Sequence, residues 1–170
     1  MIRRRKDVEW ACRLPLEDIA YLKQLIEPDG WYPMETFERF GVAILAEHGA
    51  SLEAVRFWGR MSASQYSAEH AGLVAPDDPV ESLMRLKVVR STFFDFPAFD
   101  IPMLNETHAH VVVTYHMGPR AEEAACHQTM GFCEQILSLA GATDIQAGFE
   151  ERAWRGDRRT LCSFEWQPPL

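Results

Sequence analysis

Three kinds of hydrophobic periodicity follow one another in residues 107–166, and this order constrains the fold more than any other feature. From residue 108 to residue 116, the apolar residues Ala109, Val111, Val113 and Tyr115 alternate with a second set that contains three histidines, Thr114 and Val112, which is typical of a strand. Residues 120–139 carry apolar side chains at helical spacing. Two strand-like runs follow, 143–154 and 160–166, and the turn residues Gly156 and Asp157 lie between them. The stretch therefore predicts a strand, a helix and a hairpin.

The residues before this stretch predict a helical layer and one more strand. Apolar spacing and capping residues indicate helices over 16–26, 37–45, 52–61 and 80–89. Pro97 and Pro102 exclude a long central strand, so residues 99–104 are expected to form an edge strand that turns back into the histidine-containing one. We predict an α+β fold in which N-terminal helices pack on a C-terminal antiparallel sheet, in the order hairpin, helix, hairpin. Residues 1–170 are expected to form a single domain with 107–166 as its core unit.

The charge distribution argues against a nucleic-acid partner. The formal net charge is −8, from 25 acidic and 17 basic residues. Four of the basic residues are Arg3, Arg4, Arg5 and Lys6, and without them 13 basic residues face 25 acidic ones. A body this acidic does not favour binding to phosphates. Residues 1–7 are expected to form a flexible basic tip.

No part of the sequence predicts a membrane segment. No apolar run approaches the roughly 20 residues that cross a bilayer. The N-terminus lacks the apolar stretch of a signal peptide, because Asp7, Glu9 and Arg13 interrupt it. A cytoplasmic location is therefore expected, and there the four cysteines would be reduced.

Alternate positions of a strand share a face, so His108, His110 and His116 are expected on the same side of the sheet. Two histidines at i and i+2 can chelate a transition metal. The alternative interpretation is a solvated polar face opposite the apolar one, and no neighbouring residue of the sequence completes a metal site.

An aromatic set offers either a ligand pocket or a filled core. Its candidate pocket residues are Trp58, Tyr66, Phe93, Phe94, Phe96 and Phe99. Aromatic side chains commonly line pockets for small apolar molecules, and they equally commonly fill cores. No motif for a nucleophile or for phosphate binding occurs, and therefore no enzyme activity is predicted.

The last 45 residues carry motifs that resemble the 4-vinyl-reductase-type domain. The motifs are Cys126-His127-Gln128-Thr129-Met130-Gly131-Phe132, Gly148-Phe149-Glu150-Glu151, Trp154-Arg155-Gly156-Asp157 and Cys162-Ser163-Phe164-Glu165-Trp166. That domain shares a superfamily with haem–nitric-oxide-binding domains, phenol-sensing activator domains and vesicle-tethering subunits. The resemblance is nearest to stand-alone bacterial members of unknown function. It implies an α+β domain, often a homodimer, that holds a small hydrophobic molecule.

The resemblance also raises two cofactors, zinc and haem. In phenol-sensing relatives zinc is held by a helix cysteine, a Glu-x-x-Cys and a final-strand cysteine, and Cys126, Glu150 and Cys162 stand at or near those positions. Ala153 occupies the place of the fourth ligand, which weakens the case for zinc. Haem-binding relatives carry an axial histidine helix and Tyr-x-Ser-x-Arg. Residues 80–94 contain no histidine and residues 115–120 lack the serine, and on this basis neither haem nor any other cofactor is expected.

Together these observations predict a cytoplasmic, non-enzymatic sensor or adaptor domain in signalling. Its partner would be a small hydrophobic molecule or another protein, and a homodimer is expected. The alternative from a different class is a structural protein-interaction subunit without a ligand. A metal protein or enzyme that uses the strand histidines is the third alternative.

Overall fold

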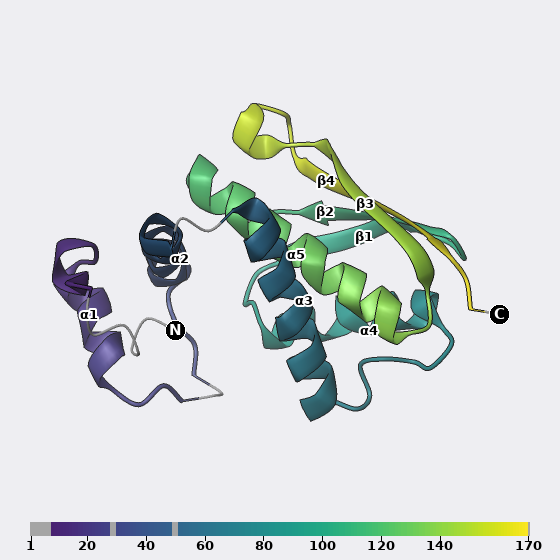
Figure 1. The fold of residues 1–170 in the computed structure, drawn as a ribbon, viewed down its shortest axis with the longest axis horizontal. Helices are drawn as coiled ribbons and strands as arrows, with labels where there is room; N and C mark the ends of the chain where they lie inside the picture. Colours follow the sequence, from purple (N-terminus) through teal and green to yellow (C-terminus); the bar gives the residue numbers. More distant parts are fainter. Residues whose placement is uncertain (1–7, 28–29, 49–50, 170) are drawn as a thin grey trace. The chain divides into compact units, whose positions relative to one another are not determined.

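The computed structural model describes residues 8–27, 30–48 and 51–169, and two units share them, Met1–Ser51 and Leu52–Leu170 (Figure 1). The expectation of a single domain over residues 1–170 stays a prediction, and the basic tip predicted for residues 1–7 lies outside the described residues. None of the described helices combines the length and the apolar content needed to cross a bilayer.

The first unit contains a short 3-10 helix, η2 (Trp10–Cys12), and two α-helices, α1 (Leu16–Lys23) and α2 (Met34–His48). Its buried core consists of Trp10, Leu14 and Ala43, with further apolar side chains of α1 and α2 packed against them. The sequence predicts α1 to continue to residue 26. The helix ends at Lys23 because Gln24 is extended, and Leu25 beyond it is 79% exposed.

A buried carboxylate joins the two helices of this unit. Asp18 of α1 is fully buried and accepts hydrogen bonds from the Thr36 hydroxyl at 2.9 Å and from Arg39 Nη2 of α2 at 2.9 Å. The hydrogen bonds from Arg39 hold the pKa of Asp18 below its usual value, with a smaller contribution from Thr36, and they outweigh the opposing effect of burial. The charge of Asp18 therefore stabilises the contact between α1 and α2.

The second unit has three α-helices and a four-stranded sheet. The helices are α3 (Leu52–Glu69), α4 (Pro79–Val89) and α5 (Pro119–Leu139), and α4 continues into η3 (Arg90–Thr92). The strands are β1 (Phe99–Leu104), β2 (His108–Val113), β3 (Thr143–Glu151) and β4 (Thr160–Gln167), with η4 (Ala153–Arg155) between the last two. All pairings are antiparallel in the order β1-β2-β4-β3, and the helices lie on one side of the sheet (Figure 1). The predicted α+β fold class is confirmed.

The alternation predicted for the histidine strand is confirmed for β2 but stops before residue 116. Ala109, Val111 and Val113 are buried beneath the helices. His116 adopts a left-handed backbone conformation with φ of 58°, and the chain leaves the sheet there to begin α5. The edge strand predicted over residues 99–104 is confirmed as β1.

Helices α3 and α5 touch backbone to backbone at two glycines. A Cβ atom at Gly59 would overlap the carbonyl oxygen of Gln128, and a Cβ at Gly131 would overlap the carbonyl oxygen of Arg56. Every other residue type carries a Cβ, so only glycine permits this distance between the helices. The two positions therefore fix how closely α5 approaches α3.

An ion pair lies beside this crossing. Glu134 of α5 is buried and accepts from Arg56 Nε at 2.9 Å and from Arg60 Nε at 3.0 Å, both on α3. Burial raises the pKa of Glu134, but hydrogen bonds from Arg56 and Arg60 outweigh it and hold the pKa below its usual value. A buried carboxylate with two guanidinium partners adds directional contacts to the steric fit of the glycines.

We expect Asp18→Asn to destabilise the first unit by about 2 kcal/mol at neutral pH, because Arg39 and Thr36 lose a charged, buried acceptor. The folded pKa of Asp18 lies below its unfolded value of about 3.9. The contribution is thus complete above that pH and disappears as the pH falls through the folded pKa. Urea unfolding from neutral to acid pH measures this contribution to the free energy of unfolding.

Glu17→Gln is the matched control, since Glu17 also contacts Arg39 but is 72% exposed, and it should change stability by less than about 0.5 kcal/mol. Equal effects of the two variants would contradict this account.

We expect Gly131→Ala to destabilise the second unit by about 3 kcal/mol, because the new methyl group overlaps a carbonyl oxygen. The better helix propensity of alanine, worth about 1 kcal/mol, does not offset this overlap. Gly148→Ala is the control in the same unit, since nothing lies within 4 Å of a Cβ there, and a change of less than about 0.5 kcal/mol is expected. Chemical denaturation of both variants checks the difference, and a stabilised Gly131→Ala variant would show that the helices are not in backbone contact.

Candidate functional site

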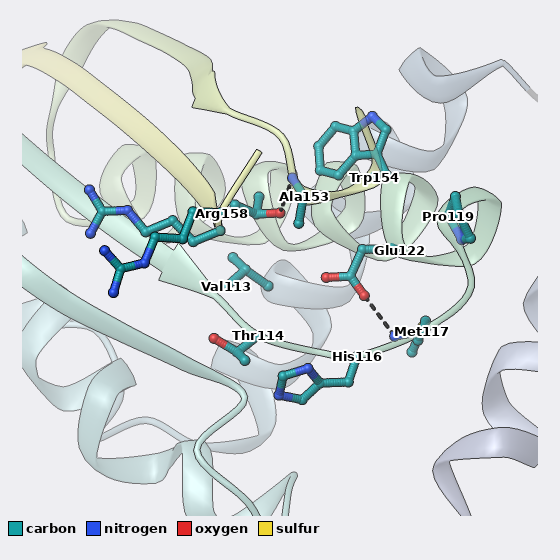
Figure 2. A pocket seen from close by; sticks show the side chains of 11 residues that line it. Val113, Thr114, His116, Met117, Pro119, Glu122, Ala153, Trp154 and Arg158 are labelled. Atoms are coloured by element: carbon teal, nitrogen blue, oxygen red, sulfur yellow. Dashed lines mark hydrogen bonds between the residues drawn. The ribbon is translucent and has the colours of Figure 1, made fainter. Parts of the chain in front are cut away.

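A pocket of about 270 Å³ opens where the end of β2, the start of α5 and the β3–β4 hairpin meet (Figure 2). Its walls combine a buried carboxylate, an indole ring and two guanidinium groups. The lining residues are Val113, Thr114, His116, Met117, Pro119, Glu122, Ala153, Trp154, Arg158, Arg159 and Thr160.

The α5 side of the pocket is shaped by the way the helix begins. Pro119 occupies the first turn, where its fixed φ suits a helix start. Glu122, in the same turn, points back so that its Oε2 accepts a hydrogen bond from the Met117 N–H at 2.9 Å (Figure 2). Tyr115 is buried beside this segment, and its hydroxyl contacts Thr129 Oγ1 of α5 at 2.6 Å. The segment between β2 and α5 is thus attached to the helix at two points.

The opposite wall comes from the hairpin turn. Gly156 has a φ of 98°, a left-handed conformation that favours glycine, and it ends η4. The Arg152 N–H donates to Asp157 Oδ2 at 2.6 Å, and the Ala153 N–H donates to Thr160 Oγ1 at 3.3 Å. These bonds hold Trp154 over the pocket.

Trp154 belongs to a small aromatic group between α5 and β3. Its ring and that of His127 both lie edge-on to Phe149, at centroid distances of 5.0 and 4.9 Å. Trp154 Nε1 and His127 Nδ1 are buried without a hydrogen-bond partner among the described residues. Burial lowers the pKa of His127, and its imidazole is therefore neutral at physiological pH.

Burial keeps the thiols of this unit protonated. Burial raises the pKa of Cys126, and the nearby carboxylate of Glu122 raises it further. Burial likewise raises the pKa of Cys133 to about 12 and that of Cys162 well above the usual value. The thiolate is the form that acts as nucleophile and metal ligand, and burial disfavours this form at all three cysteines.

Four of the six predicted aromatic pocket residues, Tyr66, Phe93, Phe94 and Phe96, form a chain of ring contacts. Centroid distances are 4.6 Å between Tyr66 and Phe93, 6.4 Å between Phe93 and Phe94, and 5.5 Å between Phe94 and Phe96. Trp58 lies half buried on α3, and Phe99 is buried at the start of β1. None of the six lines the 270 Å³ pocket. Their role in holding a ligand stays a prediction.

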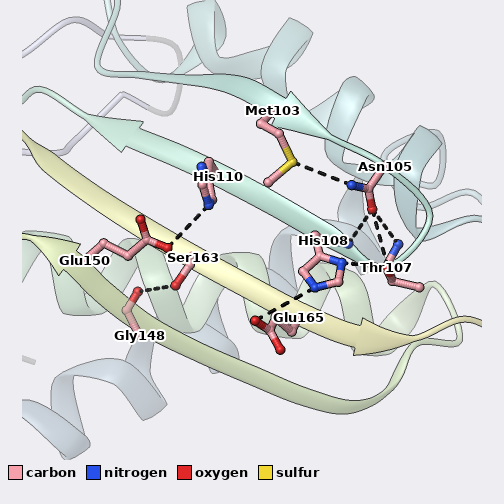
Figure 3. Close-up of polar contacts among 9 residues, drawn as sticks. All are labelled: Met103, Asn105, Thr107, His108, His110, Gly148, Glu150, Ser163 and Glu165. Carbon is pink, nitrogen blue, oxygen red and sulfur yellow. Dashed lines mark hydrogen bonds and ion pairs between the residues drawn. The ribbon is translucent and has the colours of Figure 1, made fainter.

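The structure does not bring the predicted zinc ligands together. Cys126 and Cys162 are buried between α5 and the sheet. Phe149 pairs with Cys162 and faces His127 of α5, and alternation therefore turns Glu150 to the other face, where it lies 3.4 Å from His110 (Figure 3). The described residues contain no group of three His, Cys, Asp or Glu side chains that could hold a metal ion.

The strand histidines are also divided, contrary to the prediction that they share a face. His108 lies 3.8 Å from Glu165, and His110 lies near Glu150, both on the exposed face of the sheet (Figure 3). His116 leaves the strand at its positive φ and lines the pocket instead. For His108 and His110 the polar-face interpretation fits this arrangement.

Solved structures that share the fold include H-NOX (haem nitric oxide/oxygen binding) domains. A point mutant of T. tengcongensis H-NOX is 14% identical, with a TM-score of 0.63, and the match covers 99% of this chain and 94% of that one. A mutant H-NOX protein from S. oneidensis in the Fe(II) ligation state is 12% identical, with a TM-score of 0.63 and coverage of 95% and 84%. An Fe(II) unliganded H-NOX mutant from K. algicida is 14% identical, with a TM-score of 0.62 and coverage of 95% and 92%. No family model and no curated protein matches the sequence.

These similarities show the fold, and they confirm the resemblance to haem–nitric-oxide-binding domains at that level. The resemblance to 4-vinyl-reductase-type domains stays a prediction. The prediction of no cofactor, with haem not expected, is wrong in view of the comparisons, because the similar solved structures are H-NOX domains whose descriptions name haem or its Fe(II) state. One of the similar structures, 14% identical, is described as "Probing the function of heme distortion in the H-NOX family".

Haem iron takes an axial ligand from His, Cys, Met or Tyr. In the described part of the second unit, α4 has no histidine and the thiols lie in the packed core. The pocket offers His116 and Met117, but its volume of about 270 Å³ is below the roughly 300–1,000 Å³ of sites for drug-sized ligands. This pocket is therefore too small to enclose haem.

The sequence interpretation missed the pocket. In the sequence, the helix dipole is a sufficient reason for an acidic residue at position 122. Arg158 and Thr160 stand out only as residues close to a turn. The positive φ of His116 has no sequence signature, and the closure of the hairpin over α5 depends on long-range packing. The dipeptide Gly156-Asp157 is the sequence feature that points to the pocket, since it marks the turn that carries Trp154.

We expect Cys126→Ala and Glu150→Ala to have additive effects on stability, with a coupling energy below about 0.5 kcal/mol, because the two side chains lie on opposite faces of the sheet. A shared zinc ion would couple them strongly. A double-mutant cycle by urea unfolding, with metal analysis of each protein, checks this. Arg56→Ala with Glu134→Ala is the positive control, with coupling above about 1 kcal/mol expected. Strong coupling of Cys126 with Glu150, or loss of zinc in either variant, would contradict the split arrangement.

Proposed function

We propose that this chain is a non-catalytic sensor domain in signalling that binds a small molecule and passes the bound state on through its helices. The observation that carries the proposal is the similarity in fold to H-NOX domains over nearly the whole chain. The buried thiols of Cys126, Cys133 and Cys162, whose pKa values burial raises, support a role without a cysteine nucleophile.

The pocket is placed so that its occupancy can influence α5. A ligand there contacts the end of β2, the first turn of α5 and the hairpin that carries Trp154. Helix α5 meets α3 through Gly59 and Gly131, and a shift of α5 therefore displaces α3 rather than being absorbed by side chains. A ligand moves this equilibrium only by its difference in affinity for the two arrangements.

The proposal also covers the kind of ligand, the location of the protein and its partners. Solved H-NOX structures of similar fold are described with haem, and the aromatic chain from Tyr66 to Phe96 suits a small hydrophobic molecule. We place the protein in the cytoplasm, as a homodimer or bound to a protein partner. The interaction subunit without a ligand remains the rival prediction.

We expect the purified chain to carry one small molecule or to take up one haem per chain. Native mass spectrometry detects a copurified adduct, and titration with haemin detects an intense haem absorption band that saturates at one equivalent. A protein of bare mass that also takes up no haemin and shows no shift in melting temperature with any small molecule would overturn the proposal and favour the interaction subunit.

A further inference from the structure

Glu122 is a buried carboxylate that can accept further hydrogen bonds. It is 5% exposed, and the part that is exposed lines the pocket. Its Oε2 accepts from the Met117 N–H at 2.9 Å, whereas the donor near Oε1 among the described residues is the thiol of Cys126, at 4.0 Å. A thiol is a weak donor, and a carboxylate can accept about four hydrogen bonds. One oxygen of Glu122 is therefore available to a donor that enters the pocket.

The other side of the pocket is positive. Arg158 and Arg159 both line the pocket, and Figure 2 shows Arg158 on the side away from Glu122. Arg159 is engaged by Glu151, at 2.9 Å from its Nε and 2.8 Å from its Nη2. Arg158 lines the pocket and is exposed. No hydrogen bond or ion pair joins its side chain to another described residue. Its guanidinium is available to an anionic group.

This pair of charges selects against ligands of a single sign. A simple anion would meet the carboxylate of Glu122, and a simple amine would meet the two guanidinium groups. A molecule with both charges satisfies both walls, and a volume of about 270 Å³ limits it to roughly the size of an amino acid. Trp154 supplies an apolar surface for the chain between the two charged groups.

We propose that the pocket between α5 and the β3–β4 hairpin binds a small zwitterion, with its ammonium group on Glu122 and its carboxylate on Arg158. The inference rests on the proposed sensor function and specifies the ligand of this pocket. The ammonium donates to Oε1 of Glu122, and the carboxylate accepts from the guanidinium of Arg158.

Four probes of nearly equal length test the charge requirement: 4-aminobutyrate, n-butylammonium, butyrate and n-butanol. Binding is followed by NMR shifts of the Trp154 indole N–H and by calorimetry on the full chain. We expect 4-aminobutyrate to bind at least tenfold more tightly than the other three. Glu122→Gln and Arg158→Gln should each weaken it at least tenfold, whereas the neighbouring variants Glu123→Gln and Arg155→Gln should leave its affinity unchanged.

Arg158 is exposed, so Arg158→Gln tests the proposal even if Glu122→Gln fails to fold. Equal binding of all four probes, or an unchanged affinity in Arg158→Gln, would overturn the zwitterion site. A chain that carries haem or another copurified molecule but ignores 4-aminobutyrate would overturn this inference alone. A chain that binds neither would overturn the sensor function as well.

Discussion

The contact between α3 and α5 is the constraint on which the second unit depends. The two helices meet at Gly59 and Gly131 with no side chain between their backbones, and Glu134 with its two arginine partners lies alongside. Close packing of this kind has little tolerance, because a single methyl group would overlap a carbonyl oxygen. The position of α5 over the sheet, and with it the buried face of β2 and β4, follows from this contact.

The pocket is a consequence of where α5 begins. The helix is held at its centre by α3, so its first turn lies at a fixed place beside the end of β2. The chain reaches that place through the positive φ of His116, and Glu122 then anchors the connecting segment at Met117. The hairpin closes the remaining side with Trp154. A carboxylate and two guanidinium groups consequently meet around one small space, although the helix and the hairpin that carry them are far apart in the sequence.

Fold and cofactor are separate properties here. A TM-score of 0.63 at 14% identity shows that packing pattern and topology persist where individual side chains do not. The expectation that haem is absent rested on one helix without histidine and one incomplete motif. Such motifs describe a single mode of ligation, whereas an axial ligand can come from several residue types. The descriptions of the similar H-NOX structures contradict that expectation, which two missing motifs did not suffice to support.

The sequence alone determined the order of the elements. The alternation in residues 108–113, the helical spacing before residue 139 and the prolines near β1 each depend on a few neighbouring residues, and all three predictions are confirmed. Tertiary structure decided what those elements bring together. It turned Glu150 away from Cys126 and Cys162, removed His116 from the histidine face and placed Glu122 opposite Arg158. Periodicity is local and can be seen in the sequence, but the neighbours of a side chain across the fold are set by helix distance and strand register, which no short stretch of sequence contains.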